Sequence, residues 1–388
     1  MRPRFLIPVL VGLLSSACIE TLPDDSGPPV PWPFVQPELH AQSLGEELSF
    51  RGVAVPNDDV IWVSGSGGSV FRSVDGGGTF ASLGPAGAEA LDFRSLFAFD
   101  ADRAWIASAG PGEASQLFAT VDGGVSWTRV LANEHPDGFW DALAFWDTER
   151  GILVGDATDG FLTIFTTADG GATWQRVPRA RMPESPTMMV VDGTEEPLGE
   201  YCFAASNQSV AVGVDGRAWI GTGGAVARLW RSEDFGATWT AAEVPLDSAN
   251  PAAGVFAVHM DGHRGVLIGG TYDQPERAEG NVAYTRDHGA TWQVPEERPA
   301  GYRSAVVALP RVLATAQHEA GERPQELLWG LPQLVAVGTT GVSFSRKSGR
   351  GWEELESAPK DLNAVAAAPS GAFAIAVGRG GQVVRLEF

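Results

Sequence analysis

The sequence is poor in cysteine and in positive charge. Two of its 388 residues are cysteines, so at most one intramolecular disulfide can form. Lysine and arginine together number 27 against 48 acidic residues, for a formal net charge of −21. An acidic surface repels polyanions, which disfavours nucleic acids and anionic lipid surfaces as partners.

Several catalytic and cofactor signatures are also missing. The glycine-rich strings GSGGS and GTGG are not followed by Lys-Ser/Thr, and no dinucleotide fingerprint is present. His259 and His263 lie four residues apart, but in HMDGH, where a strand leads into a turn, so the helical spacing of metal ligands does not apply. No spacing singles out a carboxylate pair for glycoside hydrolysis. We therefore expect no cofactor, no metal and no catalytic residue.

The N-terminus has the features of an export signal. Arg2 and Arg4 precede the apolar run FLIPVLVGLL and small residues up to Cys18. We expect residues 1–17 to be a signal peptide. The stretch LLSSAC resembles a bacterial lipobox, although its Leu14 lies four residues before the cysteine where the usual pattern has three.

The lipobox resemblance implies that Cys18 is lipidated and that the protein is anchored in the cell envelope outside the cytoplasm, in the outer membrane of a Gram-negative bacterium. The alternative is ordinary cleavage near Ala17, which gives a secreted protein. Residues 18–31 are acidic and proline-rich and are expected to form an extended tether. With Cys18 lipidated no intramolecular disulfide remains, and we expect Cys202, in the apolar run YCFAAS, to be a buried hydrophobic residue.

One motif, S/T-x-D-x-G-x-T/S-W, recurs along most of the chain. Its spacing of roughly 47 to 65 residues suits one four-stranded propeller blade plus variable loops. The copies are SVDGGGTF (73–80), TVDGGVSW (120–127), TADGGATW (167–174), SEDFGATW (232–239), TRDHGATW (285–292) and the degenerate SRKSGRGW (345–352).

Short apolar segments broken by Gly and Asp turns surround each copy and predict four strands per unit. Seven first strands are expected, at residues 50–55, 93–99, 140–145, 203–206, 255–259, 303–309 and 362–368. The seventh unit has only three strands before the chain stops. We expect residues 31–39, PWPFVQPEL, near Phe34, to pair with Gln382–Glu387 and close the ring. The predicted fold is all-β: a seven-bladed propeller spanning residues 32–388.

The repeated motif resembles the Asp-box, or BNR repeat, of sialidases, sortilin-type propellers and the photosystem II stability and assembly factor family. The resemblance covers roughly residues 35–388. It implies that each motif forms the hairpin between the third and fourth strands, away from the binding face. On this interpretation five aspartates are structural and not catalytic: Asp75, Asp122, Asp169, Asp234 and Asp287.

Functional residues of a propeller are expected where the inner strands begin, at one mouth of the central channel. Arg51 in FRGV, Arg94 in FRSL and Arg303 in YRSAVV follow an aromatic residue at such positions, and Asp141 occupies a comparable place in FWDALAF. The three guanidinium groups could converge on one carboxylate or phosphate. Alternatively, each arginine pairs with a nearby acid such as Asp92.

The cadence GILVGDATDGFLTIFTTADGGATW is similar to the photosystem II assembly factor-like group of bacterial propellers. In the photosynthetic members an arginine-rich patch contacts a partner protein, and Arg51, Arg94 and Arg303 would be the counterparts. We therefore expect a monomeric, non-enzymatic interaction or assembly factor that binds a protein or an anionic ligand and meets the membrane only through its lipid. The alternative is a glycan-acting enzyme of sialidase type, although the Arg-Ile-Pro motif and an evident Tyr–Glu pair are missing.

Overall fold

The computed structural model describes residues 36–191, 194–196, 198–310 and 334–388. The predicted signal peptide, Cys18, the tether and Phe34 lie outside these residues. The described residues belong to one compact unit. No helix in the described part of the chain is both long and apolar enough to cross a membrane.

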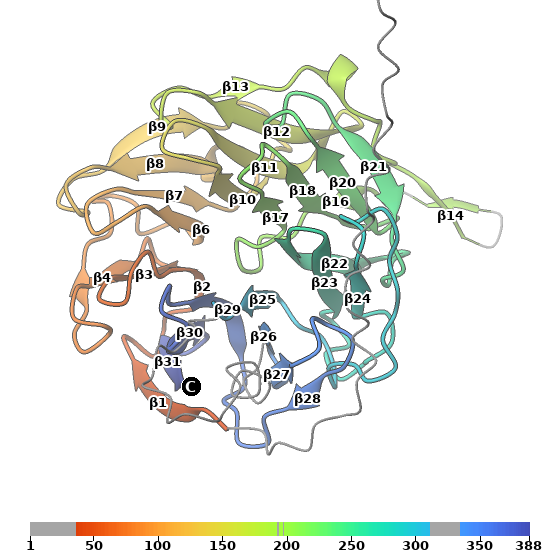
Figure 1. The fold of residues 1–388 in the computed structure, drawn as a ribbon. Helices are drawn as coiled ribbons and strands as arrows, with labels where there is room; N and C mark the ends of the chain where they lie inside the picture. Colours follow the sequence, from red (N-terminus) through yellow and green to blue (C-terminus); the bar gives the residue numbers. More distant parts are fainter. Residues whose placement is uncertain (1–35, 192–193, 197, 311–333) are drawn as a thin grey trace, which may run out of the picture. The chain divides into compact units, whose positions relative to one another are not determined.

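The compact unit is a seven-bladed β-propeller, as predicted (Figure 1). The inner strands of neighbouring blades pack against one another around the ring. Blade 1 comprises β2 (Phe50–Ala54), β3 (Ile61–Gly65), β4 (Val70–Ser73) and β5 (Ala81–Ser82). Blade 2 comprises β6 (Phe93–Ala98), β7 (Ala104–Ser108), β8 (Gln116–Thr120) and β9 (Thr128–Ala132). Blade 3 comprises β10 (Trp140–Phe145), β11 (Gly151–Thr158), β12 (Phe161–Thr167) and β13 (Gln175–Arg176).

The second half of the ring is less regular. Blade 4 comprises β17 (Val210–Val212), β18 (Ala218–Gly221), β20 (Arg228–Ser232) and β21 (Thr240–Glu243). Blade 5 is built on β22 (Asn250–Asp261), β23 (Arg264–Thr271) and β24 (Val282–Thr285), with β19 (Gly223–Gly224) and β16 (Glu200–Tyr201) added beside β22. Blade 6 comprises β25 (Ala305–Ala308), β26 (Leu334–Gly338), β27 (Gly341–Ser345) and β28 (Glu353–Glu354). Two short 3-10 helices, Gly112–Ala114 and Arg179–Arg181, and the hairpin β14 (Met189–Val191) and β15 (Thr194–Glu196) complete the described elements.

Blade 7 contains β29 (Leu362–Ala367), β30 (Phe373–Gly378) and β31 (Gln382–Glu387), and its fourth strand comes from the N-terminal side of the chain. This strand, β1 (Glu38–Ser43), pairs antiparallel with all of β31, from Glu38 with Glu387 to Ser43 with Gln382. Figure 1 shows the red β1 beside the blue β31. N-terminal closure is therefore confirmed, but the strand lies later than expected, because pairing begins at Glu38 and continues four residues past Leu39.

One predicted first strand is wrong. Residues 203–206 form turns, and the inner strand of blade 4 is β17, Val210–Val212. The apolar run YCFAAS resembles a strand in composition, but after Tyr201, which ends β16, residues 202–206 are buried without forming a strand. Cys202 is buried, as expected, and is not in a disulfide.

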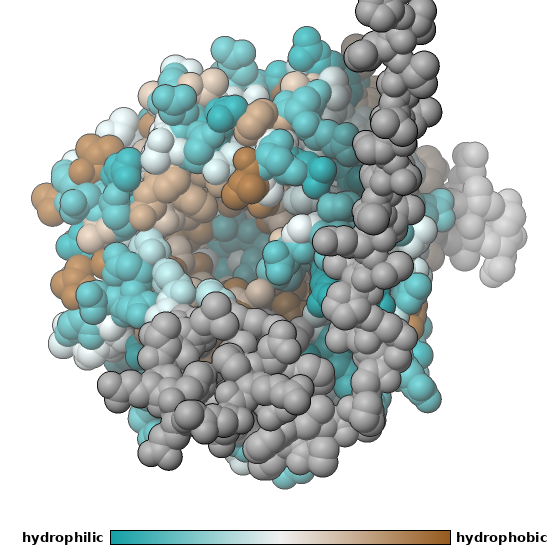
Figure 2. Space-filling model, in the orientation of Figure 1, coloured by the Kyte–Doolittle hydropathy of each residue, from teal (hydrophilic) through white to brown (hydrophobic). Residues whose placement is uncertain are grey.

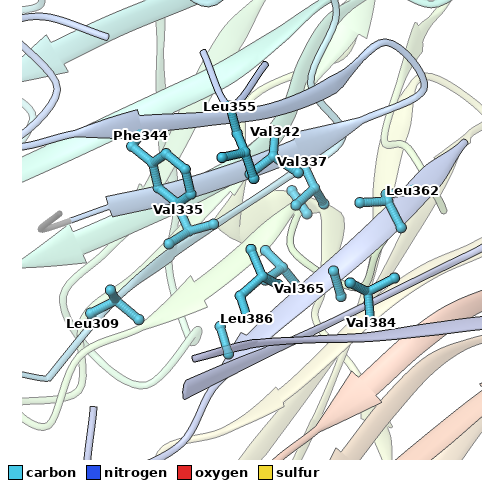
Figure 3. Close-up of a cluster of buried hydrophobic side chains, with 13 residues drawn as sticks. Leu309, Val335, Val337, Val342, Phe344, Leu355, Leu362, Val365, Val384 and Leu386 are labelled. Carbon is cyan, nitrogen blue, oxygen red and sulfur yellow. The ribbon is translucent and has the colours of Figure 1, made fainter. Parts of the chain in front are cut away.

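The hydrophobic core lies between the blades. At the junction of blades 6 and 7, side chains of β26, β27, β29 and β31 point toward one another (Figure 3). Val335, Val337, Leu362 and Val384 are fully buried there. Hydrophilic residues predominate in the coloured part of the face shown in Figure 2, which is hollowed at the centre of the ring.

The repeated motif forms the turn between the third and fourth strands. In blade 3, Asp169 Oδ1 accepts the Thr173 backbone N–H at 2.9 Å and the Thr167 hydroxyl at 2.8 Å, and Oδ2 accepts the Thr173 hydroxyl at 2.6 Å. These bonds, first that of the Thr173 hydroxyl, lower the pKa of Asp169. Gly170 and Gly171 have φ of 70° and 81°, which other residues adopt at a cost. The same bonds recur around Asp75, Asp122, Asp234 and Asp287.

The motif turns lie at the ends of the blades opposite to the starts of the inner strands. In blade 3 the Gly170 N–H donates to Glu149 O at 2.8 Å, which ties the motif to the turn that follows β10. The residue Asp141 is at the other end of β10. Geometry therefore separates the five motif aspartates from the mouth where we expected binding residues.

Candidate functional site: a cavity at the channel mouth

A cavity of about 520 Å³ lies where the inner strands begin. This volume falls in the range of small-ligand sites. The charged residues on its wall are Arg51, Arg94, Asp141, Asp156 and Arg379. The remaining lining residues are Phe139, Tyr201, Cys202, Phe203, Ala204, Ala205, Pro251, Phe256, Tyr272, Tyr302, Thr339 and Asn363. Three of the four predicted ligand-binding residues, Arg51, Arg94 and Asp141, thus share one cavity.

β-Bulges direct side chains into this cavity. The pairing of the first and second strands skips one residue in five blades, and the skipped residue lines the cavity each time. The skipped residues are Arg51, Arg94, Asp141, Phe256 and Asn363. A further shift between β11 and β12 skips Asp156. A bulge turns one side chain out of the alternating pattern, and bulges are common beside functional sites.

Arg303 does not line the cavity. In blade 1, a Cβ on Gly65 would meet Ser49 O at 2.2 Å and Phe50 Cα at 2.9 Å. In blade 6, a Cβ on Gly338 would meet Tyr302 O at 2.3 Å and Arg303 Cα at 2.9 Å. Arg303 therefore occupies the position of Phe50, and the position of Arg51 belongs to the next residue, Ser304. The match of YRS to FRG was one residue out of register, and such a slip turns a side chain to the other face.

The Arg303 side chain is instead fully buried within blade 6. Its Nη2 lies 2.6 Å from Glu354 Oε2, its Nε donates to Ser343 Oγ at 2.8 Å, and Nη1 donates to Tyr302 O at 2.9 Å. Burial lowers the pKa of Arg303, and Glu354 partly offsets this effect. These contacts satisfy the guanidinium inside the protein, so we correct the expectation that Arg303 joins Arg51 and Arg94.

The floor of the cavity is a segment that crosses the centre of the propeller, residues 203–208, which we call the plug. Asn207 Oδ1 accepts the Leu143 N–H of blade 3 at 2.8 Å, and its Nδ2 donates to Leu96 O of blade 2 at 2.9 Å. Gln208 bonds in the same way to β25 of blade 6 and β29 of blade 7. The Ser206 hydroxyl donates to Ser304 O at 2.6 Å. The plug thereby ties together inner strands that are not neighbours in the ring.

A buried ion pair holds the chain just before the plug. Glu200 is fully buried and pairs with Arg228 of β20. The same carboxylate accepts the Trp230 indole N–H at 2.9 Å and the Thr222 hydroxyl at 2.5 Å. These bonds fix the position from which the chain enters the cavity floor.

The two predicted arginines on the cavity wall, Arg51 and Arg94, have different partners. Arg94 Nε donates to Asp92 Oδ2 at 2.7 Å, as in the paired alternative considered from sequence. Arg51 Nη1 makes one long hydrogen bond, 3.5 Å, to Ala205 O of the plug. Among the described residues no carboxylate forms an ion pair with Arg51. Burial lowers the pKa of Arg51, and the neighbouring Arg94 lowers it further.

Two carboxyl groups lie on the same wall. Asp141 is 1% exposed, and its Oδ2 has no hydrogen-bond partner among the described residues. Burial raises the pKa of Asp141 well above the usual value, and Asp156 raises it further. Asp156 Oδ1 accepts the Cys202 N–H at 2.9 Å, yet burial raises the pKa of Asp156 to about 7. Ionising both carboxyl groups, Asp141 and Asp156, at the same time is therefore unfavourable.

Aromatic side chains form the rest of the wall. Phe203 of the plug stacks on Phe256 with ring centroids 3.8 Å apart, and Tyr302 meets Phe256 edge to face at 4.8 Å. Tyr272, half of which is exposed, contacts Phe256 at 6.2 Å. Burial raises the pKa of Tyr302, so its hydroxyl stays protonated. The cavity thus combines an aromatic wall with charges of both signs.

Sequence reasoning missed Asp156, Arg379, Asn363 and the plug. One signal was available for the bulge positions, because each bulged residue follows a bulky apolar residue and precedes a small one, as in FRG, FRS, WDA, VFA and LNA. In the described part of the chain, one group of three side chains could hold a metal, Glu38, His40 and Glu387, on the outer strands β1 and β31. These groups are largely exposed, and nothing there distinguishes them from ordinary surface charges.

The comparisons with known proteins identify the fold. No protein-family model and no curated protein matches the chain. The solved structure of YCF48 bound to D1 peptide is 14% identical, with 90% of this chain and 97% of that chain covered and a TM-score of 0.54. YCF48 from Cyanidioschyzon merolae gives the same identity and TM-score, with 90% and 98% covered.

A GH74 xyloglucanase from Xanthomonas campestris is 18% identical with a TM-score of 0.57, and 89% of this chain spans 53% of that chain. The predicted resemblance to photosystem II assembly factor-like propellers is confirmed at the level of the fold. At these identities the similarity shows the fold alone.

Proposed function

We propose that this protein is a non-enzymatic, extracytoplasmic lipoprotein propeller that binds a partner protein, with an anionic group of the partner in the channel-mouth cavity. One observation carries the proposal: the guanidinium of Arg51 is partly buried in the cavity and has no carboxylate partner among the described residues.

An unpaired arginine in such a place is costly, because burial removes water from its charge. An incoming carboxylate or phosphate restores the lost interactions through charge-assisted, forked hydrogen bonds. Arg94 supports the same site, since only its Nε is engaged by Asp92 and its terminal nitrogens have no hydrogen bond to a described residue. The bulges hold both arginines on rigid strands, so little ordering is needed on binding.

A peptide is the partner most in keeping with the comparisons. YCF48, a propeller of this fold, has been solved with a bound D1 peptide. The net charge of −21 disfavours polyanionic partners, so selectivity for an anion has to come from a local site such as this cavity.

The test is selection from a library of synthetic peptides on the purified protein, followed by affinity measurement on variants. We expect selected peptides to carry an acidic group, and Arg51→Met to weaken binding about ten- to a hundred-fold, since a charge-assisted bond contributes about 1.5–3 kcal/mol. The control is Arg103→Met. Arg103 pairs with Asp100 in the turn after β6, away from the cavity. Peptides that bind Arg51→Met and wild type equally would contradict the proposal.

The alternative is a glycan-acting enzyme, which the acid pair Asp141 and Asp156 and the xyloglucanase-like fold keep open. A panel of sialosides and neutral oligosaccharides tests it. Turnover that is lost in Asp141→Asn and Asp156→Asn would replace the binding function by a hydrolytic one.

Anchoring is tested separately in the source cells. We expect Cys18→Ser to release the protein from the envelope fraction and to abolish labelling by a fatty-acid analogue. Wild-type protein that takes up no label and fractionates as soluble would establish secretion instead.

A further inference from the structure

The cavity holds unpaired charges of both signs. Asp141 has a buried carboxylate oxygen with no partner, and Arg51 has a guanidinium with one long bond. Among the described residues, no ion pair joins Arg51 or Arg94 to Asp141 or Asp156. Opposite charges on one wall that do not neutralise each other are complementary to a ligand that also carries both signs.

The geometry explains why these charges stay apart. Arg94 is the arginine whose charge acts on Asp141, but its Nε is held at 2.7 Å by Asp92. Asp156 is held by the Cys202 N–H at the entrance to the plug. Arg51 is oriented toward Ala205 in the plug itself. Arg94, Asp156 and Arg51 therefore each contact a separate neighbour instead of an opposite charge in the cavity.

The arginines of the cavity form no ion pair with Asp141 or Asp156 among the described residues, so these two acids can accept a cationic group from a ligand. The backbone N–H groups of Ala204 and Asp156 partly offset the rise in the pKa of Asp141, yet its Oδ2 has no hydrogen-bond partner among the described residues. An ammonium group offers three donors and one positive charge, and so it can satisfy Asp141 Oδ2 and Asp156 together. A neutral sugar hydroxyl would satisfy the hydrogen bond but would not favour the ionised form of either acid.

The aromatic wall adds a third requirement. Phe203, Phe256 and Tyr302 form a continuous aromatic surface in the cavity, extended by the half-exposed Tyr272. Such a surface removes an apolar or aromatic group from water and gains edge-to-face contacts with an aromatic ring. A ligand with ammonium, carboxylate and an apolar body has the chemistry of an amino acid or a very short peptide.

We propose that the cavity binds a zwitterionic ligand of the amino-acid type, with its ammonium group on Asp141 and Asp156, its carboxylate on Arg51, and an apolar or aromatic side chain on Phe203, Phe256 and Tyr302. The proposal rests on the proposed function in using Arg51 as the anion site, and adds the ammonium site. The ligand can be a free amino acid or a dipeptide, in which the charges are one residue, about 3.8 Å, further apart.

The experiment is calorimetric titration of the full-length protein with the free amino acids and with Phe-Ala and Ala-Phe. We expect binding by an apolar or aromatic member of this set. For the tightest ligand, capping the amine by acetylation or the carboxylate by amidation should each weaken binding at least about tenfold, the loss expected for one charge-assisted bond. Preference for the free amino acids or for the dipeptides identifies the source.

Variants assign the two ends. Asp156→Asn keeps the acceptor for Cys202 and should weaken the free and the amidated ligand but not the acetylated one. Arg51→Met should weaken the free and the acetylated ligand but not the amidated one. Asp100→Asn, in the turn after β6, should change neither. Equal binding of acetylated and free ligand, or no binding by any zwitterion, overturns the ammonium site. In either case, if the binding of acidic peptides still depends on Arg51, the proposed function stands. If peptide binding does not depend on Arg51, both the proposed function and the zwitterion site are wrong.

Discussion

The side chain of Gln208 and the backbone of Val365 are joined across the centre of the ring, with Gln208 Nε2 donating to Val365 O at 2.8 Å. The other end of the amide, Oε1, accepts the Val306 N–H at 2.7 Å. One side chain from the approach to blade 4 thus satisfies backbone groups of blades 6 and 7. The channel that runs through a propeller is closed here by hydrogen bonds as well as by the packing of Phe203 on Phe256.

The amide of Gln208 is matched to one donor and one acceptor, so Gln208→Glu should be destabilising. A carboxylate can accept from Val306 but places a negative oxygen against Val365 O. We expect a loss of about 2–4 kcal/mol, more than the 1–3 kcal/mol of an unsatisfied neutral group, because a charge is involved. Denaturant unfolding measures it. The control is Gln42→Glu, since Gln42 donates a 2.8 Å bond to Gly77 O at an exposed site. Similar small losses in both variants would mean that the plug contributes little to stability.

Arg303 should matter for stability and not for binding. Removing it takes the ion-pair partner from Glu354 Oε2, which is 35% exposed, and one donor from Ser343 Oγ, which keeps its bond to Glu354 Oε1. We expect Arg303→Ala to cost about 2–3 kcal/mol, below the usual cost of breaking a fully buried pair, because water reaches Glu354. Adding Glu354→Gln to the Arg303→Ala variant should recover part of the lost stability.

The matching measurement is peptide affinity at a temperature where the variant is folded. It should equal that of wild type within about twofold, in contrast to Arg51→Met. A folded Arg303→Ala protein with greatly weakened binding would place Arg303 back in the site.

The repeat is readable from sequence because its turn chemistry is local. The Ser/Thr, Asp and Gly residues of TADGGATW form hydrogen bonds with one another inside the eight-residue motif. Each copy therefore indicates one hairpin by itself. The six copies mark six blades, and the seventh is recognised from its first strand, predicted at residues 362–368. The missing fourth strand of blade 7 predicts closure by the N-terminal segment. The prediction placed the closing strand in the apolar PWPFVQPEL, whereas the more polar Glu38–Ser43 is the strand that pairs.

The site was only half predictable because it depends on register and on the plug. Arg51 and Asp141 were found because each follows an aromatic residue at the start of an inner strand. Arg303 was misplaced because Tyr302 imitates Phe50 in the pattern while the backbone contact at Gly338 sets a different register. Asp156 lies on a second strand, and only the fold brings it beside Asp141.

The acid pair should make stability depend on pH in a defined direction. The pKa of Asp156 is raised to about 7 in the fold from about 4 in an unfolded chain, so between these values the folded state holds more protons. Its contribution is therefore complete below about pH 4 and is lost as the pH rises through 7. Asp141 and Cys202, which face Asp156, also have raised pKa values, and Arg94 acts in the opposite direction on Asp141.

Asp156→Asn removes the loss of stability at high pH and keeps the oxygen that accepts the Cys202 N–H. We expect the variant to be more stable than wild type by about 1–3 kcal/mol at pH 8, and the gain to disappear near pH 4. Thermal unfolding at a series of pH values measures both. Asp159→Asn is the control, because Arg179 lowers the pKa of Asp159, and its removal should give no gain at pH 8. A constant difference between Asp156→Asn and wild type from pH 4 to 8 would contradict the proposed ionisation.

Ring closure can be tested by two deletions that differ only in β1. Removing residues 1–35 leaves all described strands in place, whereas removing residues 1–43 also deletes Glu38–Ser43 and uncovers the whole of β31. An uncovered strand presents unpaired backbone groups that attract other chains, and the contact of Leu39 with the core between blades 6 and 7 is lost as well. We expect the longer deletion to lower the unfolding midpoint sharply and to aggregate at concentrations where the shorter one is monodisperse. Light scattering and denaturant unfolding separate the two effects. Equal midpoints and equal unfolding slopes for the two deletions would show that the ring is held closed by its inner strands alone, without β1.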